Sequence, residues 1–299
     1  MSLEIATSVE RSQASRLRLL DYVELTKPRI CFLVLVTTAV GFCLGERGTI
    51  DGWLLAQALL GTALLGGGSS ALNHLLERGP DAHMRRTENR PLPAGRLQPA
   101  EVGIFGGALV LLGIATLFLR VNQLTGVLGA ISFVSYVFIY TPLKRVTSLN
   151  THVGAIPGAL PTVMGFTAAR NAFGPDACVL FAILFLWQLP HFLAIAWLYR
   201  EDYRRAGYPM LPVLDPDGSI TGRQVILYSS ALLLTSLLPS MFGRAGMIYF
   251  FGALGLGLGF LAFGAALAIS KSERDARRVV IASVIYLPLL LTLLMIDRI

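Results

Sequence analysis

The sequence predicts an all-α membrane protein built as a bundle of nine transmembrane helices. Of its 299 residues, 54% are hydrophobic and only 14% are charged, whereas soluble domains carry roughly 25% charged residues. Apolar stretches also alternate with short polar breaks, and a helix needs about 20 apolar residues to cross a bilayer. The predicted spans are residues 29–46, 52–77, 100–119, 123–141, 151–169, 176–199, 224–242, 246–269 and 279–296.

Lysine and arginine are divided unevenly between the two sides of this predicted bundle. With the N-terminus in the cytoplasm, 20 of the 25 basic residues fall on the cytoplasmic side. The positive-inside rule therefore predicts a multi-pass protein with its N-terminus in the cytoplasm and its C-terminus on the opposite side. We expect the membrane to be the bacterial inner (plasma) membrane. This topology accounts for the net charge of +7 without nucleic acid as a partner. The five basic residues on the other side are Arg47, Arg120, Arg170, Arg244 and Arg298.

The chain before the first span is amphipathic. Residues 12–26 mix leucine and valine with arginine, which is typical of a short helix lying on the membrane surface next to lipid. We therefore expect an N-terminal tail with this interfacial helix over residues 1–28, and a single transmembrane domain over residues 29–299. The acid-containing loops 78–99 and 200–223 both fall on the cytoplasmic side, so we expect the active site at that face.

The second span ends in polar residues spaced four apart, namely Asn73, Glu77 and Asp81. Residues at this spacing share one face of a helix. Pro80 disfavours a helical conformation at Gly79, so we expect the helix to stop near residues 77–78 and Asp81 to lie in the loop. One or two carboxylates, completed by water and phosphate, suit Mg²⁺. The alternative is a salt-bridged helix end, although Asn73 lies inside the span, where a polar group is costly.

Arginines follow these carboxylates directly. Guanidinium groups match phosphate oxygens with a planar fork of donors, so the cluster indicates a phosphate site. The alternative is topogenic charge without a specific ligand. The cluster consists of Arg78, Arg85, Arg86, Arg90 and Arg96.

A second group of polar residues ends the fourth span. Tyr140 and Lys144 can share a helix face, although Pro142 can end the helix between them. Lys144 would neutralise a leaving phosphate as a point charge. The alternative is an ordinary membrane-interface anchor of tyrosine followed by Lys144 and Arg145.

The sixth span contains His191 after Pro190, with Gln188 nearby. At 100° per residue, His191 and Asp202 would lie about 20° apart on one face of a single helix. A polar residue within a span favours a functional role. The alternative is a histidine that is satisfied within the protein.

Carboxylates and arginines at one face, with apolar walls behind them, indicate a ligand with a diphosphate head and a hydrocarbon tail. A polyprenyl diphosphate has this form. Its ionisation leaves an allylic carbocation, so the site must neutralise the departing diphosphate, exclude water and orient an electron-rich acceptor.

At these positions the chain resembles the UbiA superfamily of intramembrane prenyltransferases, and within it most closely the branch of protoheme IX farnesyltransferases, or heme O synthases. The resemblance covers nearly the whole chain. It is carried by Asn73, Glu77 and Asp81 together with residues 26–29 (TKPR), 84–97 (MRRTENRPLPAGRL), 140–145 (YTPLKR), 150–169 (NTHVGAIPGALPTVMGFTAA), 189–192 (LPHF) and 199–213 (YREDYRRAGYPMLPV).

The resemblance implies a UbiA-like bundle and transfer of the farnesyl group of farnesyl diphosphate to a vinyl group of heme B, with addition of water, to give heme O. It implies Mg²⁺ as cofactor, with heme B as substrate. The implied metal and diphosphate ligands are Asn73, Glu77, Asp81 and Asp202. The implied contacts with phosphates or heme propionates are Arg85, Arg86, Arg90, Lys144, Arg145 and Arg200. Tyr140 and Tyr199 would line the reaction mouth, and His191 would contact the heme, with its imidazole as an iron ligand.

The chain departs from the wider superfamily at four positions. Glu77 and Gly79 stand where relatives usually carry aspartate, which leaves the number of Mg²⁺ ions open. Tyr199 and Tyr203 stand where quinone-type enzymes tend to carry aspartate, which favours the heme branch.

Several alternatives stay open. Within the enzyme class, the other acceptors are an aromatic quinone precursor and chlorophyllide. Outside it, the alternatives are a transporter, which should have a mid-membrane site, and a scaffold for assembly of a respiratory complex. A heme A synthase or a terminal oxidase would be the partner that receives the product.

Overall fold

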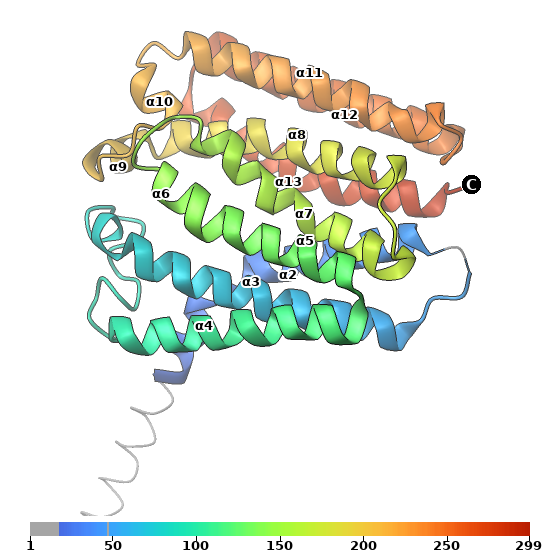
Figure 1. Ribbon diagram of the computed structural model, residues 1–299. Coiled ribbons are helices and arrows are strands. Elements are labelled where there is room, and N and C mark those ends of the chain that lie inside the picture. The colour runs from blue at the N-terminus through green and yellow to red at the C-terminus, as the bar shows by residue number, and fades with distance from the viewer. Residues whose placement is uncertain (1–17, 47) are drawn as a thin grey trace, which may run out of the picture.

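The computed structural model describes residues 18–46 and 48–299, which form a bundle of long helices (Figure 1). In this part of the chain the only β pairing is an isolated antiparallel bridge between Ala245 and Arg298. The predicted all-α class is therefore confirmed. The elements are α2 (Pro28–Gly45), α3 (Gly52–Asp81), α4 (Pro99–Thr116), η1 (Leu117–Val121), α5 (Gln123–Val134), η2 (Ser135–Tyr140), α6 (Thr141–Leu143), α7 (Asn150–Arg170), α8 (Pro175–Leu198), α9 (Arg200–Arg205), α10 (Leu211–Leu214), α11 (Ser219–Met241), α12 (Met247–Ser270) and α13 (Glu273–Ile296).

Each of the nine predicted spans coincides with a helix or with a run of consecutive helices. Within the described residues, eight are long and apolar enough to cross a membrane. The exception is α7, which has 21 residues but contains two prolines and a polar first turn. By length and composition the count is thus eight, one fewer than predicted.

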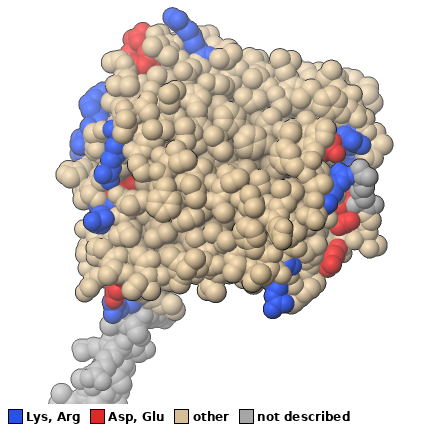
Figure 2. All heavy atoms as spheres, in the orientation of Figure 1, with Lys and Arg blue, Asp and Glu red and all other residues tan. Residues whose placement is uncertain are grey.

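Charged side chains gather at the two ends of the bundle, and the visible flank between them is almost entirely uncharged (Figure 2). Large apolar side chains such as Leu119 and Ile269 are more than four-fifths exposed, as expected for residues that contact lipid. The protein is therefore a multi-pass membrane protein. Helices α6, α9 and α10 lie at one end of the bundle, and the C-terminus lies at the other (Figure 1).

Small residues bring α2 and α7 into close contact. A Cβ atom on Gly165 would lie 1.9 Å from the carbonyl oxygen of Thr38, and one on Gly41 would lie 2.0 Å from that of Thr162. Only glycine permits this approach of the two backbones. The contact fixes the position of α2. The first residue of α2, Pro28, therefore lies at the end of the bundle that carries the carboxylates.

The second span continues to Asp81, so the prediction that it stops near residues 77–78 and leaves Asp81 in the loop is wrong. Pro80 cannot donate to the carbonyl of Leu76, but Nη2 of Arg145 donates to that oxygen at 2.8 Å. Gly79 has no Cβ to clash with the proline ring. The helix therefore passes Pro80 without leaving an orphaned carbonyl at that position.

The fourth span is also continuous past its proline. The π-helical segment η2 leads directly into α6, and Pro142 lies in the first turn of α6. The hydroxyl of Thr141 donates to the carbonyl of Tyr136 at 2.8 Å. Tyr140 and Lys144 consequently stay on one face.

The sixth span ends earlier than a single helix through Asp202 requires. Helix α8 ends at Leu198, Tyr199 leaves the helical conformation, and α9 begins at Arg200. The prediction that His191 and Asp202 share one face of one helix is therefore wrong.

The amphipathic segment before the first span is described only from residue 18, and residues 12–17 lie outside the described residues. Residues 18–25 are helical, with Leu19 and Leu20 exposed. Arg96 ties this helix to the loop after α3 through Asp21 at 2.8 Å and Glu24 at 2.9 Å. The division into a tail of residues 1–28 and a domain of residues 29–299 stays a prediction.

Candidate active site at the end of α3

Asn73 is fully buried and held on both sides of its amide. Its Nδ2 donates to the hydroxyl of Thr141 at 3.1 Å, and its Oδ1 accepts from Nζ of Lys27 at 2.9 Å. The amide thus joins α3 to α6 and to the start of α2, and its position is fixed by contacts far apart in the sequence.

Glu77 lies one turn nearer the end of α3 and is buried against Lys144. The Nζ atom of Lys144 is 2.7 Å from Oε1 of Glu77 and 4.7 Å from the centre of the Tyr140 ring. The expected shared face of Tyr140 and Lys144 is thereby confirmed. Burial opposes the charge on Lys144, but the carboxylate of Glu77 outweighs it and raises the pKa of Lys144 well above its ordinary value.

Asp81 is the last residue of α3 and is 1% exposed. Its Oδ2 accepts from Nη1 of Arg90 at 2.6 Å, while Oδ1 is buried without a hydrogen-bond partner among the described residues. The hydroxyl of Thr87 donates to its backbone carbonyl at 2.9 Å, which holds the following loop against the helix end. A buried carboxylate oxygen without a partner suits a hard cation.

Lys27 belongs to this site, and no role was assigned to it from the sequence. It stands in the left-handed conformation, with φ of 49°, where the chain turns from the helix at residues 18–25 into α2. Burial, followed by the nearby charge of Arg90, lowers the pKa of Lys27 to about 7. The sequence feature that could have indicated this turn is Pro28, because the residue before a proline disfavours the helical conformation.

The second acidic motif is built differently. Asp202 is paired with Arg205, and Glu201 with Arg204 at 2.6 Å, each three residues further along the chain. The structure does not bring Asp202 into contact with Asn73, Glu77 or Asp81.

The two motifs meet instead through side chains of their loops. The guanidinium of Arg86 lies 5.2 Å from the centre of the Tyr199 ring, and its Nη2 is 3.5 Å from the hydroxyl of Tyr203. Met84 and Tyr208 share a buried apolar cluster. The Tyr208 hydroxyl is buried without a partner among the residues described, and burial raises its pKa above the usual range.

The remaining arginines separate into distinct environments. Arg85 is exposed. Arg145 donates to the Leu76 carbonyl, as described above. Arg200 donates to the carbonyl of Trp197 at 2.9 Å and lies over its indole ring, at the end of α8. Of the arginines expected to meet phosphate, only Arg90 touches one of the three first-motif residues.

His191 belongs to α8, and its side chain faces α13 inside the bundle. Its Nδ1 is 2.7 Å from the hydroxyl of Ser283, and its ring stacks on Trp187 with centroids 5.4 Å apart. A hydrogen bond at Nδ1 fixes the ring and directs Nε2 elsewhere. The structure therefore shows His191 as an oriented histidine with one bonded nitrogen, and its contact with heme stays a prediction.

In the described part of the chain, no three His, Cys, Asp or Glu side chains gather closely enough to hold a metal ion. The donor set is nevertheless suited to Mg²⁺, which is commonly held by one or two carboxylates and completed by water and substrate phosphates. Glu77 and Asp81 supply such carboxylates, and the unpartnered oxygen of Asp81 is the open position.

Comparison with known proteins gives a consistent result. The sequence pattern of the UbiA prenyltransferase family matches residues 34–289. The protoheme IX farnesyltransferase of Solibacter usitatus is 48% identical over 288 residues, which cover 93% of this chain and 98% of that protein. The protoheme IX farnesyltransferase of Salinibacter ruber is 46% identical, again with 93% and 98% covered.

Solved structures share the fold at lower sequence identity. A digeranylgeranylglyceryl phosphate synthase superposes with a TM-score of 0.77 at 17% identity, covering 94% of this chain and 98% of that one. A UbiA homolog from Archaeoglobus fulgidus, bound to GPP and Mg²⁺, superposes with a TM-score of 0.68 at 18% identity, covering 92% and 99%. These likenesses confirm the UbiA-like arrangement of the helices.

Proposed function

Because the chain belongs to the UbiA prenyltransferase family, we propose that it transfers the farnesyl group of farnesyl diphosphate to a vinyl group of heme B, with addition of water, giving heme O and diphosphate. One observation carries the proposal of a diphosphate site. Asn73, Glu77 and Asp81 are buried at one end of α3, and each faces a basic side chain from elsewhere in the chain. The choice of heme as acceptor is supported by the two relatives that match nearly full length.

Glu77 and Asp81 would hold Mg²⁺ together with the amide oxygen of Asn73. When bound, Mg²⁺ neutralises charge on the departing diphosphate. Lys144 and Arg90 retain donors beyond those that contact the carboxylates, and these can bind diphosphate oxygens. Lys27 lies at the same end and adds a third cation when its amine is protonated. Before the substrate enters, Lys144 and Arg90 neutralise the carboxylates of Glu77 and Asp81. The same cations are then in place to meet the dianionic or trianionic diphosphate.

The allylic carbon–oxygen bond breaks, and its electron pair leaves with the diphosphate. The heme vinyl group then attacks the farnesyl cation, and water adds to the new carbocation and releases a proton. The aromatic rings of Tyr136 and Tyr140 stack with centroids 5.7 Å apart beside Lys144. Such ring faces stabilise positive charge and keep bulk water away.

The second motif would complete the site from the side of the acceptor. Asp202 is the proposed additional metal ligand, once it is released from Arg205. The exposed Arg85, together with Arg86 and Arg200, would contact phosphates or heme propionates, and Tyr199 would line the reaction mouth. His191 is the proposed heme contact, because Ser283 fixes its ring.

The site faces the cytoplasm of a bacterial inner membrane in this proposal, as the Lys and Arg distribution indicates. The product would pass to a heme A synthase or a terminal oxidase.

A turnover assay tests the proposed reaction. Purified protein in nanodiscs is incubated with heme B, farnesyl diphosphate and Mg²⁺. The products are separated by chromatography, and their masses are determined by mass spectrometry. We expect a heme species heavier by one farnesyl group and one water, which EDTA abolishes. A product formed only with an aromatic acceptor would retain the diphosphate site and overturn the heme assignment. No product with any acceptor, from folded protein, would contradict prenyl transfer.

A further inference from the structure

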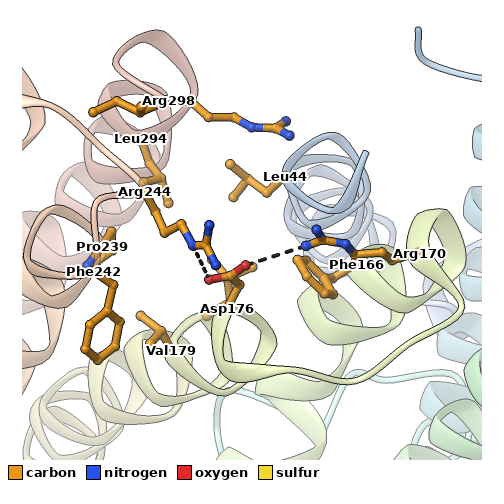
Figure 3. Close-up of a pocket in the computed structure, with 12 residues that line it drawn as sticks. Leu44, Phe166, Arg170, Asp176, Val179, Pro239, Phe242, Arg244, Leu294 and Arg298 are labelled. Atoms are coloured by element: carbon orange, nitrogen blue, oxygen red, sulfur yellow. Dashed lines mark hydrogen bonds and ion pairs between the residues drawn. The ribbon is translucent and has the colours of Figure 1, made fainter. Parts of the chain in front are cut away.

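A cavity of about 200 Å³ lies at the end of the bundle that holds the C-terminus, opposite the carboxylate site. Figure 3 shows the residues that line it. Helices α2, α7, α11 and α13 end around it, and α8 begins there. It is separate from every residue assigned above to prenyl transfer. Pockets that enclose drug-sized ligands measure about 300–1,000 Å³, so this space suits a small polar head rather than a whole prenyl or heme substrate.

The side chains lining this cavity carry an excess of positive charge. Arg170, Arg244 and Arg298 line it, and Asp176 is the one acidic side chain among the lining residues. The net charge of these side chains is therefore +2.

The four charged groups are arranged so that two arginines share one carboxylate. Nε of Arg244 lies 3.0 Å from Oδ1 of Asp176, and Nη1 of Arg170 lies 3.5 Å from Oδ2 (Figure 3). Among the described residues, Arg298 donates to two backbone carbonyls, those of Cys43 and Glu46. Since a guanidinium has five N–H donors, Arg170 and Arg244 both keep donors for a further anion.

A purely mechanical role for these arginines accounts for only part of this arrangement. Asp176 alone can join α7, α8 and the turn after α11, but one carboxylate against two guanidinium groups leaves a net positive charge that this joining role does not explain. The membrane topology also disfavours arginine at this end. Yet three of the five basic residues predicted on this side line one cavity.

The walls of the cavity are mixed in character. Phe166, Val179, Leu180 and Leu294 provide an apolar side next to the guanidinium groups. Ends of membrane helices lie at the depth where lipid phosphates meet acyl chains. A ligand that matches both sides is amphiphilic and anionic.

We propose that this cavity binds the phosphate of an anionic phospholipid from the leaflet opposite the carboxylate site. Arg170 and Arg244 contact the phosphate oxygens, and the first acyl carbons pack on the apolar wall. Guanidinium groups form strong, charge-assisted hydrogen bonds with phosphate. The bound lipid adds the negative charge that Asp176 alone does not supply.

Native mass spectrometry of the detergent-purified protein, titrated with phosphatidylglycerol or phosphatidylcholine, tests this proposal. We expect one phosphatidylglycerol to bind in preference to phosphatidylcholine, and Arg244→Gln to weaken it about tenfold. Asp176→Asn removes the competing carboxylate and should strengthen binding. Arg120→Gln is the matched control, because Arg120 is exposed, lies on the same predicted side of the membrane and does not line the cavity.

Equal binding of the two lipids, or equal losses in Arg244→Gln and Arg120→Gln, would overturn the proposal. Weaker binding in Asp176→Asn, from protein with an unchanged melting temperature, would also contradict it. Inorganic phosphate that displaces the lipid at equal concentration would show an anion site without a lipid preference and would reject the lipid as occupant. Farnesyl transfer should persist in Arg244→Gln, so this test and the turnover assay can fail independently.

Discussion

The two acidic motifs lie at the same end of the bundle, the first on the last turns of α3 and the second on α9, yet they obtain their partners differently. Glu77 and Asp81 are buried. Glu77 pairs with Lys144 at the end of α6, and Asp81 pairs with Arg90 in the loop that follows α3. Asp202 meets an arginine three residues away. Tertiary structure therefore preorganises the first motif, whereas local pairing holds the second. We infer that the first motif sets the diphosphate position and that the second joins after a local rearrangement.

The largest effect on turnover is expected from Asp81→Ala. This change removes a carboxylate with a free buried oxygen, and preorganised charge at such a position contributes about 10²–10³-fold to kcat. Steady-state heme O formation measures the loss. Glu201→Ala is the matched control, because Glu201 is an exposed acid with a local partner. Similar losses in both variants would contradict the distinction between the motifs.

Lys144→Met should have the largest effect on stability. It leaves the carboxylate of Glu77 buried without its partner, which costs about 3–5 kcal/mol for a broken buried pair. Thermal unfolding in detergent should show a clear fall in melting temperature. The double variant Lys144→Met with Glu77→Gln should recover much of it. A double variant that is no more stable than the single one would show that Glu77 does not depend on Lys144.

Asp202→Asn should reduce turnover less than Asp81→Ala does. We expect a fall in kcat/KM of about tenfold, which corresponds to about 1.4 kcal/mol of transition-state stabilisation. The melting temperature should hardly change, because the pair with Arg205 is local. If Asp202→Asn removed all activity, the second motif would be as essential to turnover as the first. That result would contradict the proposed difference between the two motifs.

The smallest effect is expected from Arg145→Met. Because Arg145 caps the carbonyl that Pro80 leaves free, the change should destabilise the end of α3 by about 1 kcal/mol. The KM for farnesyl diphosphate should rise only slightly. A large rise in KM with unchanged stability would instead support the original expectation that Arg145 binds phosphate.

The sequence predicted the helices well because long apolar runs and the Lys and Arg distribution depend on local composition. It also placed Asn73 and Glu77 on one face, since four-residue spacing defines a helix face, but it expected Asp81 in the loop, whereas α3 continues through that residue. It could not show that Lys27 reaches Asn73, because that contact joins residues 46 positions apart. The same limit explains Pro80: proline rules predict a helix end, and only the fold brings Arg145 to the free carbonyl.

The most direct test of the central claim is Mg²⁺-dependent binding of a non-ionising farnesyl diphosphate analogue, measured by calorimetry. The wild type, Glu77→Gln and Asp202→Asn should be compared with and without Mg²⁺. We predict tight, Mg²⁺-dependent binding to the wild type, a loss of that dependence in Glu77→Gln, and only a modest weakening in Asp202→Asn. Unchanged Mg²⁺-dependent binding in Glu77→Gln would contradict the assignment of the diphosphate site to the end of α3.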